Sequence, residues 1–374
     1  MGFDADVIVV GAGPGGASAA FFLRQAGCAV RIVEKMTLPR YKVCAGGVPG
    51  TCFAMFPFSC HPVVEQEVTQ ATFVYHDQSV THRLPSGSLF MVMRDRFDAL
   101  LVERSGAEVQ DRCEVRSVAQ DQSGATVTLS TGQTLRARYV IGADGANSRT
   151  GRSLGLLNGR RHGVALESEV EVEPQVQNSF QNRILVGLGM LDNGYYWVFP
   201  KSRHLSVGIG TMKRGVSSLP GIFSRSMSRH GIRLGQRKPY GYPLPVYVHN
   251  KHLHSQRVFL VGDAAGLVDP LTGEGIRHAL ESGRIAAEVI SSGQEQFYSE
   301  RIASALGRDL VWANRLARLF YAHQNVCFKW LVKNTLVFQD LMRIFSARLS
   351  YRRAMGRIPL YALTHALGIS KAGD

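Results

Sequence analysis

Cysteine is scarce in this sequence, and no two cysteines are spaced as a CxxC pair. The six are Cys28, Cys44, Cys52, Cys60, Cys113 and Cys327. Because no cysteines have paired spacing, we predict no disulfide framework. Because no basic segment precedes the first apolar run in MGFDADVIVV, we predict no secretory signal. The even spacing of Cys44, Cys52 and Cys60 before His61 matches no common ligand pattern, so no metal site is expected.

Long apolar runs are also missing. No stretch approaches the roughly 18 apolar residues that a membrane-spanning helix needs, so a cytoplasmic protein is expected. The 374 residues are 45% hydrophobic and 19% charged, which is ordinary for a globular protein and long enough for about two domains.

Acidic residues are the minority charge, with 29 against 43 lysines and arginines. The imbalance is concentrated in residues 301–374, which hold 12 basic and 3 acidic residues. Basic and apolar residues alternate there at helical spacing, as in LMRIFSARLSYRRAM. Two interpretations stay open: a helical region with a solvated basic face, or peripheral docking on an anionic membrane. No nucleic-acid motif accompanies the charge, so no nucleic acid partner is expected.

The N-terminal segment DVIVVGAGPGGASAAFFLRQAGCAVRIVEK predicts a βαβ unit. Residues 6–10 and 29–33 are short apolar runs typical of buried strands, and 17–25 has the pattern of a helix. The glycines between them form a GxGxxG sequence, which permits a tight turn and close approach of a pyrophosphate to the helix N-terminus. Glu34 ends the second strand, where a carboxylate can accept hydrogen bonds from ribose hydroxyls. The segment therefore predicts a dinucleotide site.

Two later segments have the same strand-then-glycine pattern. Residues 139–141 run into Gly142, Asp144 and Gly145, and residues 258–261 run into Gly262 and Asp263. A glycine-rich turn follows Asp263 and opens a helix near Gly275. We expect Asp263 to bond a polyol hydroxyl, and the N–H groups of 273–276 to face a developing anion such as that of a reduced flavin.

Together, GAGPGG with Glu34, GADGANS and GDAAGLVDPLTGEGI resemble the FAD-binding segments of the para-hydroxybenzoate hydroxylase-like flavoproteins. Within that superfamily, the Cys-Ala-Gly-Gly segment at 44–47 and YYWVFPK at 195–201 resemble the geranylgeranyl reductases. The resemblance covers most of residues 1–295. It implies an α/β, overall α+β, protein that binds FAD.

The resemblance also implies which residues contact the cofactor. Arg94 of RDRFDALL matches an arginine that contacts FAD in these proteins. The full set expected to bind FAD is Gly11, Gly13, Pro14, Gly15, Gly16, Glu34, Lys35, Arg40, Ala45, Gly46, Arg94, Asp263, Gly273, Glu274, Gly275 and Ile276.

Cys44 and the YYWVFPK segment are the candidate substrate-side residues. In the geranylgeranyl reductases the cysteine of this motif lies near the flavin and faces the substrate cavity. Cys44 is therefore expected to position substrate or tune the flavin, with proton delivery as a further option; the alternative is a small buried residue beside close-packed glycines. Tyr195, Trp197 and Phe199 are expected to line an apolar cavity, although such alternation is also typical of a half-buried strand. Lys201 is compatible with an anionic head group.

Motif order predicts a discontinuous Rossmann-like FAD-binding domain from 1–66, 92–160 and 252–295. Residues 67–91 and 161–251 are predicted to form an antiparallel β-sheet substrate domain, and 296–374 a helical C-terminal region. Runs such as VTQATFVYH and RHLSVGIGTM have the alternation of strands.

The implied reaction is reduction of carbon–carbon double bonds in a polyprenyl (geranylgeranyl) chain on a lipid, diphosphate, quinone or chlorophyll-type substrate. An unactivated alkene needs a proton as well as a hydride, so Cys44, Tyr195 or a water is the expected proton donor. NADPH and reduced ferredoxin are both open as electron donors. Two alternatives remain: an FAD-dependent monooxygenase or halogenase of the same fold, and a membrane-associated electron-transfer flavoprotein. An electron-transfer flavoprotein of that kind ordinarily has a set of cysteines that binds an iron–sulfur cluster, and this sequence lacks such a set.

Overall fold

The chain folds into two compact units, each assembled from separated segments. The computed structural model describes residues 2–157, 161–213, 215–216, 218–235, 238–248, 252–332, 334–359 and 361. The first unit contains Met1–Lys42, Arg94–His162 and Leu244–Val311, and the second contains Val43–Met93, Gly163–Pro243 and Trp312–Asp374. The predicted combination of α/β architecture with a helical C-terminal region is confirmed. Among the described residues, no helix has the length and hydropathy needed to cross a bilayer.

A seven-stranded sheet forms the centre of the first unit. Its order is β8-β2-β1-β11-β10-β9, with β17 on the other side of β11. The parallel strands are β1 (Ala5–Val10), β2 (Val30–Val33), β8 (Glu108–Gln110), β11 (Thr134–Gly142) and β17 (Val258–Leu260). Antiparallel pairing adds β9 (Val115–Gln120) and β10 (Ala125–Leu129). The apolar runs of β1, β2 and β17 are almost wholly buried, as expected for parallel strands covered on both faces.

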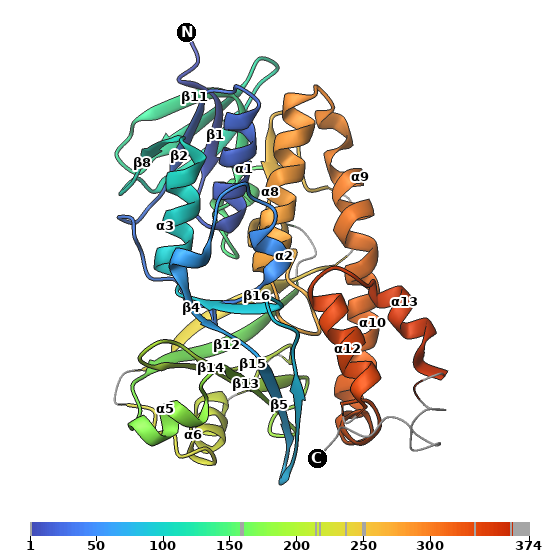
Figure 1. The fold of residues 1–374 in the computed structure, drawn as a ribbon. Coiled ribbons are helices and arrows are strands. Elements are labelled where there is room, and N and C mark those ends of the chain that lie inside the picture. Colours follow the sequence, from blue (N-terminus) through green and yellow to red (C-terminus); the bar gives the residue numbers. More distant parts are fainter. Residues whose placement is uncertain are drawn as a thin grey trace. The chain divides into compact units, whose positions relative to one another are not determined.

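Helix α1 (Pro14–Gln25) connects β1 to β2 and completes the predicted βαβ unit. It packs against α3 (Arg94–Ser105) and α8 (Ile276–Ser291), and Figure 1 shows α1 and α8 side by side. Gly283 allows this approach, because a Cβ there would lie 2.3 Å from the carbonyl oxygen of Gly15. The shorter helices of the unit are α4 (Arg149–Ser153), α7 (Gly262–Ala265) and α9 (Tyr298–Ile302).

The large sheet of the second unit is mixed, which corrects the prediction of an antiparallel sheet. Its order is β16-β12-β15-β14-β13-β5-β6. The strands are β5 (Gln70–Tyr75), β6 (Gln78–Arg83), β12 (Arg161–Val170), β13 (Arg183–Leu188), β14 (Gly194–Pro200), β15 (Leu205–Thr211) and β16 (Tyr240–Val246). Hairpins make β13-β14-β15 and β5-β6 antiparallel, but β13 pairs with β5 in parallel. No turn joins those two strands, so local sequence does not fix their relative direction.

A three-stranded sheet, β3-β7-β4, explains why residues 43–66 group with the second unit, whereas the sequence assigned them to the nucleotide domain. Strands β3 (Gly47–Pro49) and β4 (Val64–Glu67) both pair antiparallel with β7 (Leu89–Val92). The helices of the second unit that precede its C-terminal region are α2 (Gly50–Phe53), α5 (Pro174–Ser179) and α6 (Leu219–Ser228).

Helices follow in the C-terminal region: α10 (Arg308–Ala322), α11 (Gln324–Cys327), α12 (Thr335–Phe345) and α13 (Tyr351–Gly356). Within the second unit, Phe328 directly after α11 stacks on Tyr75 of β5, and Phe338 of α12 stacks on His82 of β6. These two aromatic contacts pack the region onto β5 and β6. Residues 362–374 of the predicted helical region lie outside the described residues.

Candidate functional site

The glycines after β1 form a turn that side chains would block. Gly11 has φ +105°, and a Cβ there would lie 2.5 Å from the carbonyl oxygen of Ala143. A Cβ on Gly16 would lie 2.0 Å from the carbonyl oxygen of Gly11. Pro14 occupies the first turn of α1, where its missing N–H costs no hydrogen bond. The turn therefore presents the N-terminus of a 12-residue helix without side chains in front of it.

Glu34 lies directly beside this turn. Its Oε2 accepts a hydrogen bond from the Ala12 N–H at 2.9 Å, and its Oε1 accepts one from the Met36 N–H at 3.1 Å. The side chain is buried, whereas the neighbouring Lys35 is exposed. The carboxylate is thus fixed where β2 ends, at the position expected for the ribose contact.

Four buried charges surround the approach to Gly13. Arg40 Nε lies 3.2 Å from Glu34 Oε2, and Arg40 Nη1 lies 3.1 Å from Asp98 Oδ2. Arg94 binds the same Asp98 carboxylate through Nε and Nη2, both at 2.8 Å. A Cβ on Gly13 would lie 3.7 Å from Arg40 Nη2 and 3.9 Å from Arg94 Nη2. Both guanidinium groups therefore face the side of the turn that the missing side chain leaves open.

This arrangement fits the pyrophosphate of FAD, because guanidinium groups and helix N-termini both bind phosphate oxygens. Asp98 was missed by sequence reasoning, although it holds Arg40 and Arg94 together and is fully buried. Its signal was the i,i+4 spacing from Arg94, which places both side chains on one face of a helix such as α3.

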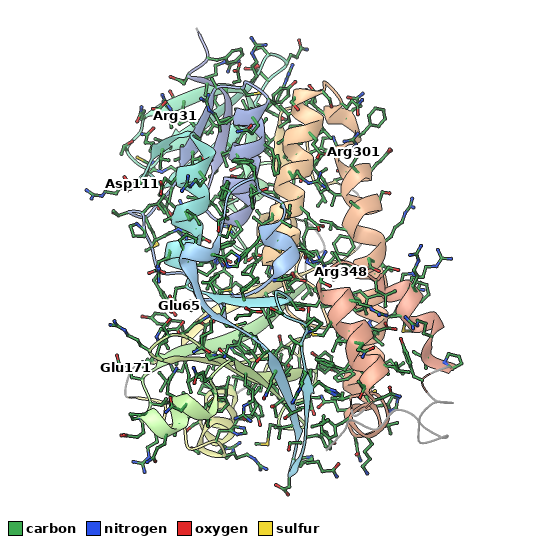
Figure 2. The ribbon with its side chains drawn as sticks, in the orientation of Figure 1. Arg31, Glu65, Asp111, Glu171, Arg301 and Arg348 are labelled. Atoms are coloured by element: carbon green, nitrogen blue, oxygen red, sulfur yellow. The ribbon has the colours of Figure 1, made fainter. Side chains whose placement is uncertain are left out.

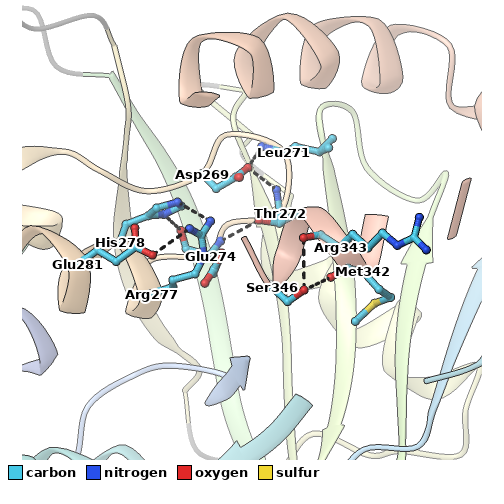
Figure 3. Close-up of polar contacts among 10 residues, drawn as sticks. All are labelled: Asp269, Leu271, Thr272, Glu274, Arg277, His278, Glu281, Met342, Arg343 and Ser346. Atoms are coloured by element: carbon cyan, nitrogen blue, oxygen red, sulfur yellow. Dashed lines mark hydrogen bonds and ion pairs between the residues drawn. The ribbon is translucent and has the colours of Figure 1, made fainter. Parts of the chain in front are cut away.

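The loop after β17 is closed by hydrogen bonds from Asp269. Its Oδ1 accepts from the N–H groups of Leu271 and Thr272 at 2.7 and 3.0 Å (Figure 3). The Asp269 N–H donates to the Glu274 carbonyl, and the Gly273 N–H donates to the Asp269 carbonyl, both at 2.9 Å. Gly273 adopts φ +71°. Gly275 precedes α8 as a cap without a side chain. Asp263 Oδ1 lies 3.3 Å from the position of a Cβ on Gly275, so Asp263 faces the start of this helix. Its expected contact with the flavin half of the cofactor stays a prediction.

Glu274 is the unusual member of the loop. Burial raises the pKa of its carboxyl to about 7, although the nearby Arg277 opposes this effect. Its Oε2 lies 3.4 Å from Arg277 Nε, and within the described part of the chain its Oε1 is buried with no hydrogen-bond partner. Burial, and then Arg277, lower the pKa of His278, whose Nε2 lies 2.9 Å from Arg277 Nη2 (Figure 3). An unsatisfied carboxyl oxygen beside an open helix N-terminus fits the polar edge of a flavin.

In the second unit, the Cys-Ala-Gly-Gly segment lies against β7. Gly46 has φ +69°, and a Cβ there would lie 2.0 Å from the carbonyl oxygen of Val92 and 2.7 Å from Lys201 Nζ. The Val92 N–H donates to the Gly46 carbonyl at 2.9 Å, and the Gly46 N–H donates to Cys44 Sγ at 3.4 Å. The half-buried Cys44 is thus held by the backbone of its own segment.

Lys201 holds this segment through hydrogen bonds to backbone carbonyl groups. Its side chain is fully buried, and Nζ donates to the carbonyl oxygens of Ala45 at 2.7 Å and Val92 at 3.0 Å. Burial lowers the pKa of the Lys201 ammonium, while nearby carboxylates and Cys44 oppose that change. Lys201 therefore supports the Cys44 backbone, and its expected contact with a substrate head group stays a prediction.

The three predicted aromatic residues occupy one face of β14. The ring centroids of Tyr195 and Trp197 lie 5.9 Å apart, and a Cβ on Gly47 would lie 3.4 Å from the Phe199 ring. Tyr195 packs with Leu188, Phe328 and Val332 in an apolar cluster. Their lining of a substrate cavity stays a prediction.

Glycines in the neighbouring strands make room for the β14 rings. A Cβ on Gly208 would lie 2.1 Å from the Trp197 ring, and one on Gly187 would lie 1.8 Å from the Tyr196 ring. Packing of these rings therefore requires glycine at positions 187 and 208.

Sequence reasoning also missed Glu167 and Glu169. Both belong to β12 and interact electrostatically with Lys201. Their signal was the alternation in ALESEV, which places two carboxylates on one face of a strand.

Comparisons with known proteins bear on the family and the fold of this chain. The family model described as an FAD binding domain matches residues 4–186. Digeranylgeranylglycerophospholipid reductase 1 of Methanopyrus kandleri is 32% identical over 78% of this chain and 81% of its own length. Digeranylgeranylglycerophospholipid reductase 2 of the same organism is 29% identical over 91% and 92%.

Among solved structures, a geranylgeranyl bacteriochlorophyll reductase-like protein of Thermoplasma acidophilum superposes with a TM-score of 0.76 at 24% identity, and the match covers 98% of each chain. This likeness confirms the fold. The sequence relatives and the FAD-domain match show the family: this chain belongs to the geranylgeranyl reductase family of FAD-dependent flavoproteins.

Proposed function

We propose that this protein is an FAD-dependent oxidoreductase that saturates carbon–carbon double bonds of a polyprenyl chain on a lipid, diphosphate, quinone or chlorophyll-type substrate. The observation that carries the proposal is the meeting of two family motifs inside the second unit. Lys201 of YYWVFPK donates from Nζ to the carbonyl oxygen of Ala45 in the Cys-Ala-Gly-Gly segment at 2.7 Å. Residues more than 150 positions apart are thereby joined as one support for Cys44.

The chemistry requires a hydride and a proton for each double bond. Reduced FAD, when bound, supplies the hydride. A trisubstituted alkene is activated by protonation at its CH carbon, which gives tertiary cationic character at the neighbouring carbon. Aromatic ring faces stabilise such a charge, and we assign that role to Tyr195, Trp197 and Phe199. Cys44 and Tyr195 are the side chains proposed to place or deliver the proton.

The first unit would hold the cofactor with its own residues. Gly11, Gly13 and Gly16 would admit the pyrophosphate to the N-terminus of α1, with Arg40 and Arg94 on its oxygens. Asp263 and the start of α8 would bind the flavin half, where the open N–H groups favour negative charge.

The test is an anaerobic single turnover. The FAD-loaded protein is reduced with stoichiometric dithionite and mixed with geranylgeranyl diphosphate or a geranylgeranylated glycerolipid. Flavin absorbance and product mass are then followed. Reoxidation with a product heavier by two hydrogens per bond is expected. Flavin that stays reduced until oxygen is admitted, with oxygen or halogen then entering the product, would assign a monooxygenase or halogenase. NADPH and reduced ferredoxin are compared as electron donors in the reductive step.

Two substitutions test the substrate-side residues. Cys44→Ser and Tyr195→Phe are expected to keep FAD and to slow reoxidation by prenyl substrate by roughly 100-fold, the scale of a lost proton-transfer group. Cys113→Ser and Tyr240→Phe are matched controls, because Cys113 is a half-buried cysteine of the first unit and Tyr240 is 52% exposed. Wild-type rates in Cys44→Ser and Tyr195→Phe would remove these roles.

We also propose peripheral contact between the C-terminal helices and an anionic membrane, which would present a lipid substrate. Leu319 and Val326 are 45% and 56% exposed, and basic residues are exposed near them in sequence, including Arg315, Arg318 and Lys329. Sedimentation with phosphatidylglycerol vesicles, but not with phosphatidylcholine vesicles, is expected and should weaken with added salt. Equal sedimentation with both would contradict the proposal.

A further inference from the structure

Two carboxylates lie behind Cys44 on one face of β12. Glu167 is 2% exposed and accepts a hydrogen bond from the Cys44 N–H. Glu169 follows two residues later and shares a hydrogen bond with the Glu167 carboxyl. Ser206 Oγ donates to Glu167 Oε1 at 3.4 Å. The two carboxyls therefore form a continuous pair that begins at the Cys44 backbone.

Lys201 interacts electrostatically with both carboxyls of this pair and with Cys44. Its ammonium lies within electrostatic range of Glu169, Cys44, Glu167 and Glu65. An ammonium carries three N–H donors, and two of them serve the Ala45 and Val92 carbonyls. Burial lowers the pKa of Lys201, which brings release and recapture of a proton closer to neutral pH.

Glu169, the member of the pair that is not bonded to Cys44, is partly exposed at the surface of the second unit. His204 Nε2 lies 2.9 Å from Glu169 Oε2, and the two side chains are 22% and 21% exposed. This is an ion-pair distance without hydrogen-bond geometry, because within the described part of the chain neither atom has a hydrogen-bond partner. Gln177 Nε2 donates to the carbonyl oxygens of Lys201 and His204, which fixes the turn between β14 and β15. Titratable groups thus follow one another from solvent to Cys44.

We propose that His204, Glu169, Glu167 and Lys201 form a proton path from the surface of the second unit to Cys44. The inference rests on the proposed function, because every reduced double bond consumes one proton from solution. The Cys44 thiol gives its proton to the alkene carbon that does not receive the flavin hydride. The thiolate then takes a proton from the Lys201 ammonium, Lys201 takes one from the Glu167 carboxyl, and water refills Glu167 through Glu169 and His204. With the hydride that reduced FAD would supply when bound, the proton from Cys44 would saturate one double bond.

The charge state of Glu167 suits a proton store. Burial, and next the neighbouring Glu169 carboxylate, raise the pKa of Glu167 to about 8, whereas the Cys44 N–H and Lys201 oppose the rise. Glu167 is therefore protonated at neutral pH and can release its proton when Lys201 becomes neutral. Glu65, which accepts from the Ser202 hydroxyl, is the other carboxylate that faces Lys201.

The experiment uses the FAD-loaded, dithionite-reduced protein and geranylgeranyl diphosphate. Glu167→Gln is expected to slow anaerobic flavin reoxidation by roughly tenfold or more and to remove the inflection of the rate near pH 8. Glu171→Gln is the matched control, because Glu171 is exposed just beyond β12 (Figure 2) and should react as wild type. His204→Ala should also be slow, and added imidazole should restore its rate, whereas a purely structural loss would not respond to imidazole.

A second readout does not depend on turnover. The infrared spectrum of the wild type at pH 7 should contain a carboxylic acid C=O band that is missing in Glu167→Gln and retained in Glu171→Gln. If wild type reoxidises but Glu167→Gln keeps its rate and pH profile, the proton path is wrong and the proposed function stands. If wild-type flavin is not reoxidised by the prenyl substrate, the proposed function fails, and the path fails with it.

Discussion

Asp98 is a residue that we expect to support cofactor binding by holding two arginines in place. Its buried carboxylate binds both Arg40 and Arg94, whose Nη2 atoms face Gly13. Asp98→Asn should release both guanidinium groups and raise the Kd for FAD by about tenfold or more, since a charge-assisted pair is stronger than a neutral one. Equilibrium dialysis measures the change. Glu103→Gln, on the exposed side of the same helix, is the control. Unchanged FAD affinity in Asp98→Asn would show that the arginines are held by other contacts.

Gly46 is a residue whose substitution tests a backbone contact. A side chain there combines a left-handed φ with a Cβ 2.0 Å from the Val92 carbonyl oxygen. Gly46→Ala should therefore lower the thermal midpoint and displace Cys44. Gly27→Ala is the matched control, because Gly27 has φ +84° but no atom within 4 Å of a Cβ. The control should lose only the roughly 1–2 kcal/mol of left-handed strain, and calorimetry should find the larger loss in Gly46→Ala. Equal losses would mean that the segment moves freely.

At the scale of elements, the sequence predicted those parts of the fold in which short-range pattern and long-range packing agree. The strands β1, β2 and β17 follow buried apolar runs, and α1 follows directly from the glycine turn. The parallel pairing of β13 with β5 could not be predicted, because the two strands come from distant segments. The same limit applies to the site. Lys201, Glu167 and Ala45 come together only through sheet pairing and the β3–β7 contact, so local patterns such as the alternation in ALESEV could not show that these residues share one site.

For the whole molecule, a buried carboxyl group and buried histidines make opposite contributions to the pH dependence of stability. Burial first of all raises the pKa of Glu274 from 4.5 to about 7, so the folded state keeps a proton that the unfolded state releases. This contribution is fully present below about pH 4.5 and is lost as pH rises through about 7. Burial also lowers the pKa of His82, His230, His254 and His278. Their contribution has the opposite sign and is lost as pH falls below about 6.5.

Glu274→Gln separates the two contributions. Between pH 5 and 8, the stability of the wild type relative to this variant should fall by at most about 3 kcal/mol, the value of the pKa difference. The histidines, common to both proteins, cancel in that difference. Chemical denaturation of both proteins at matched FAD loading measures it, with Glu103→Gln as an exposed carboxylate that should run parallel to wild type. A stability difference that does not change with pH would contradict this prediction. It would mean that the ion pair with Arg277 keeps Glu274 ionised in the folded protein throughout this pH range.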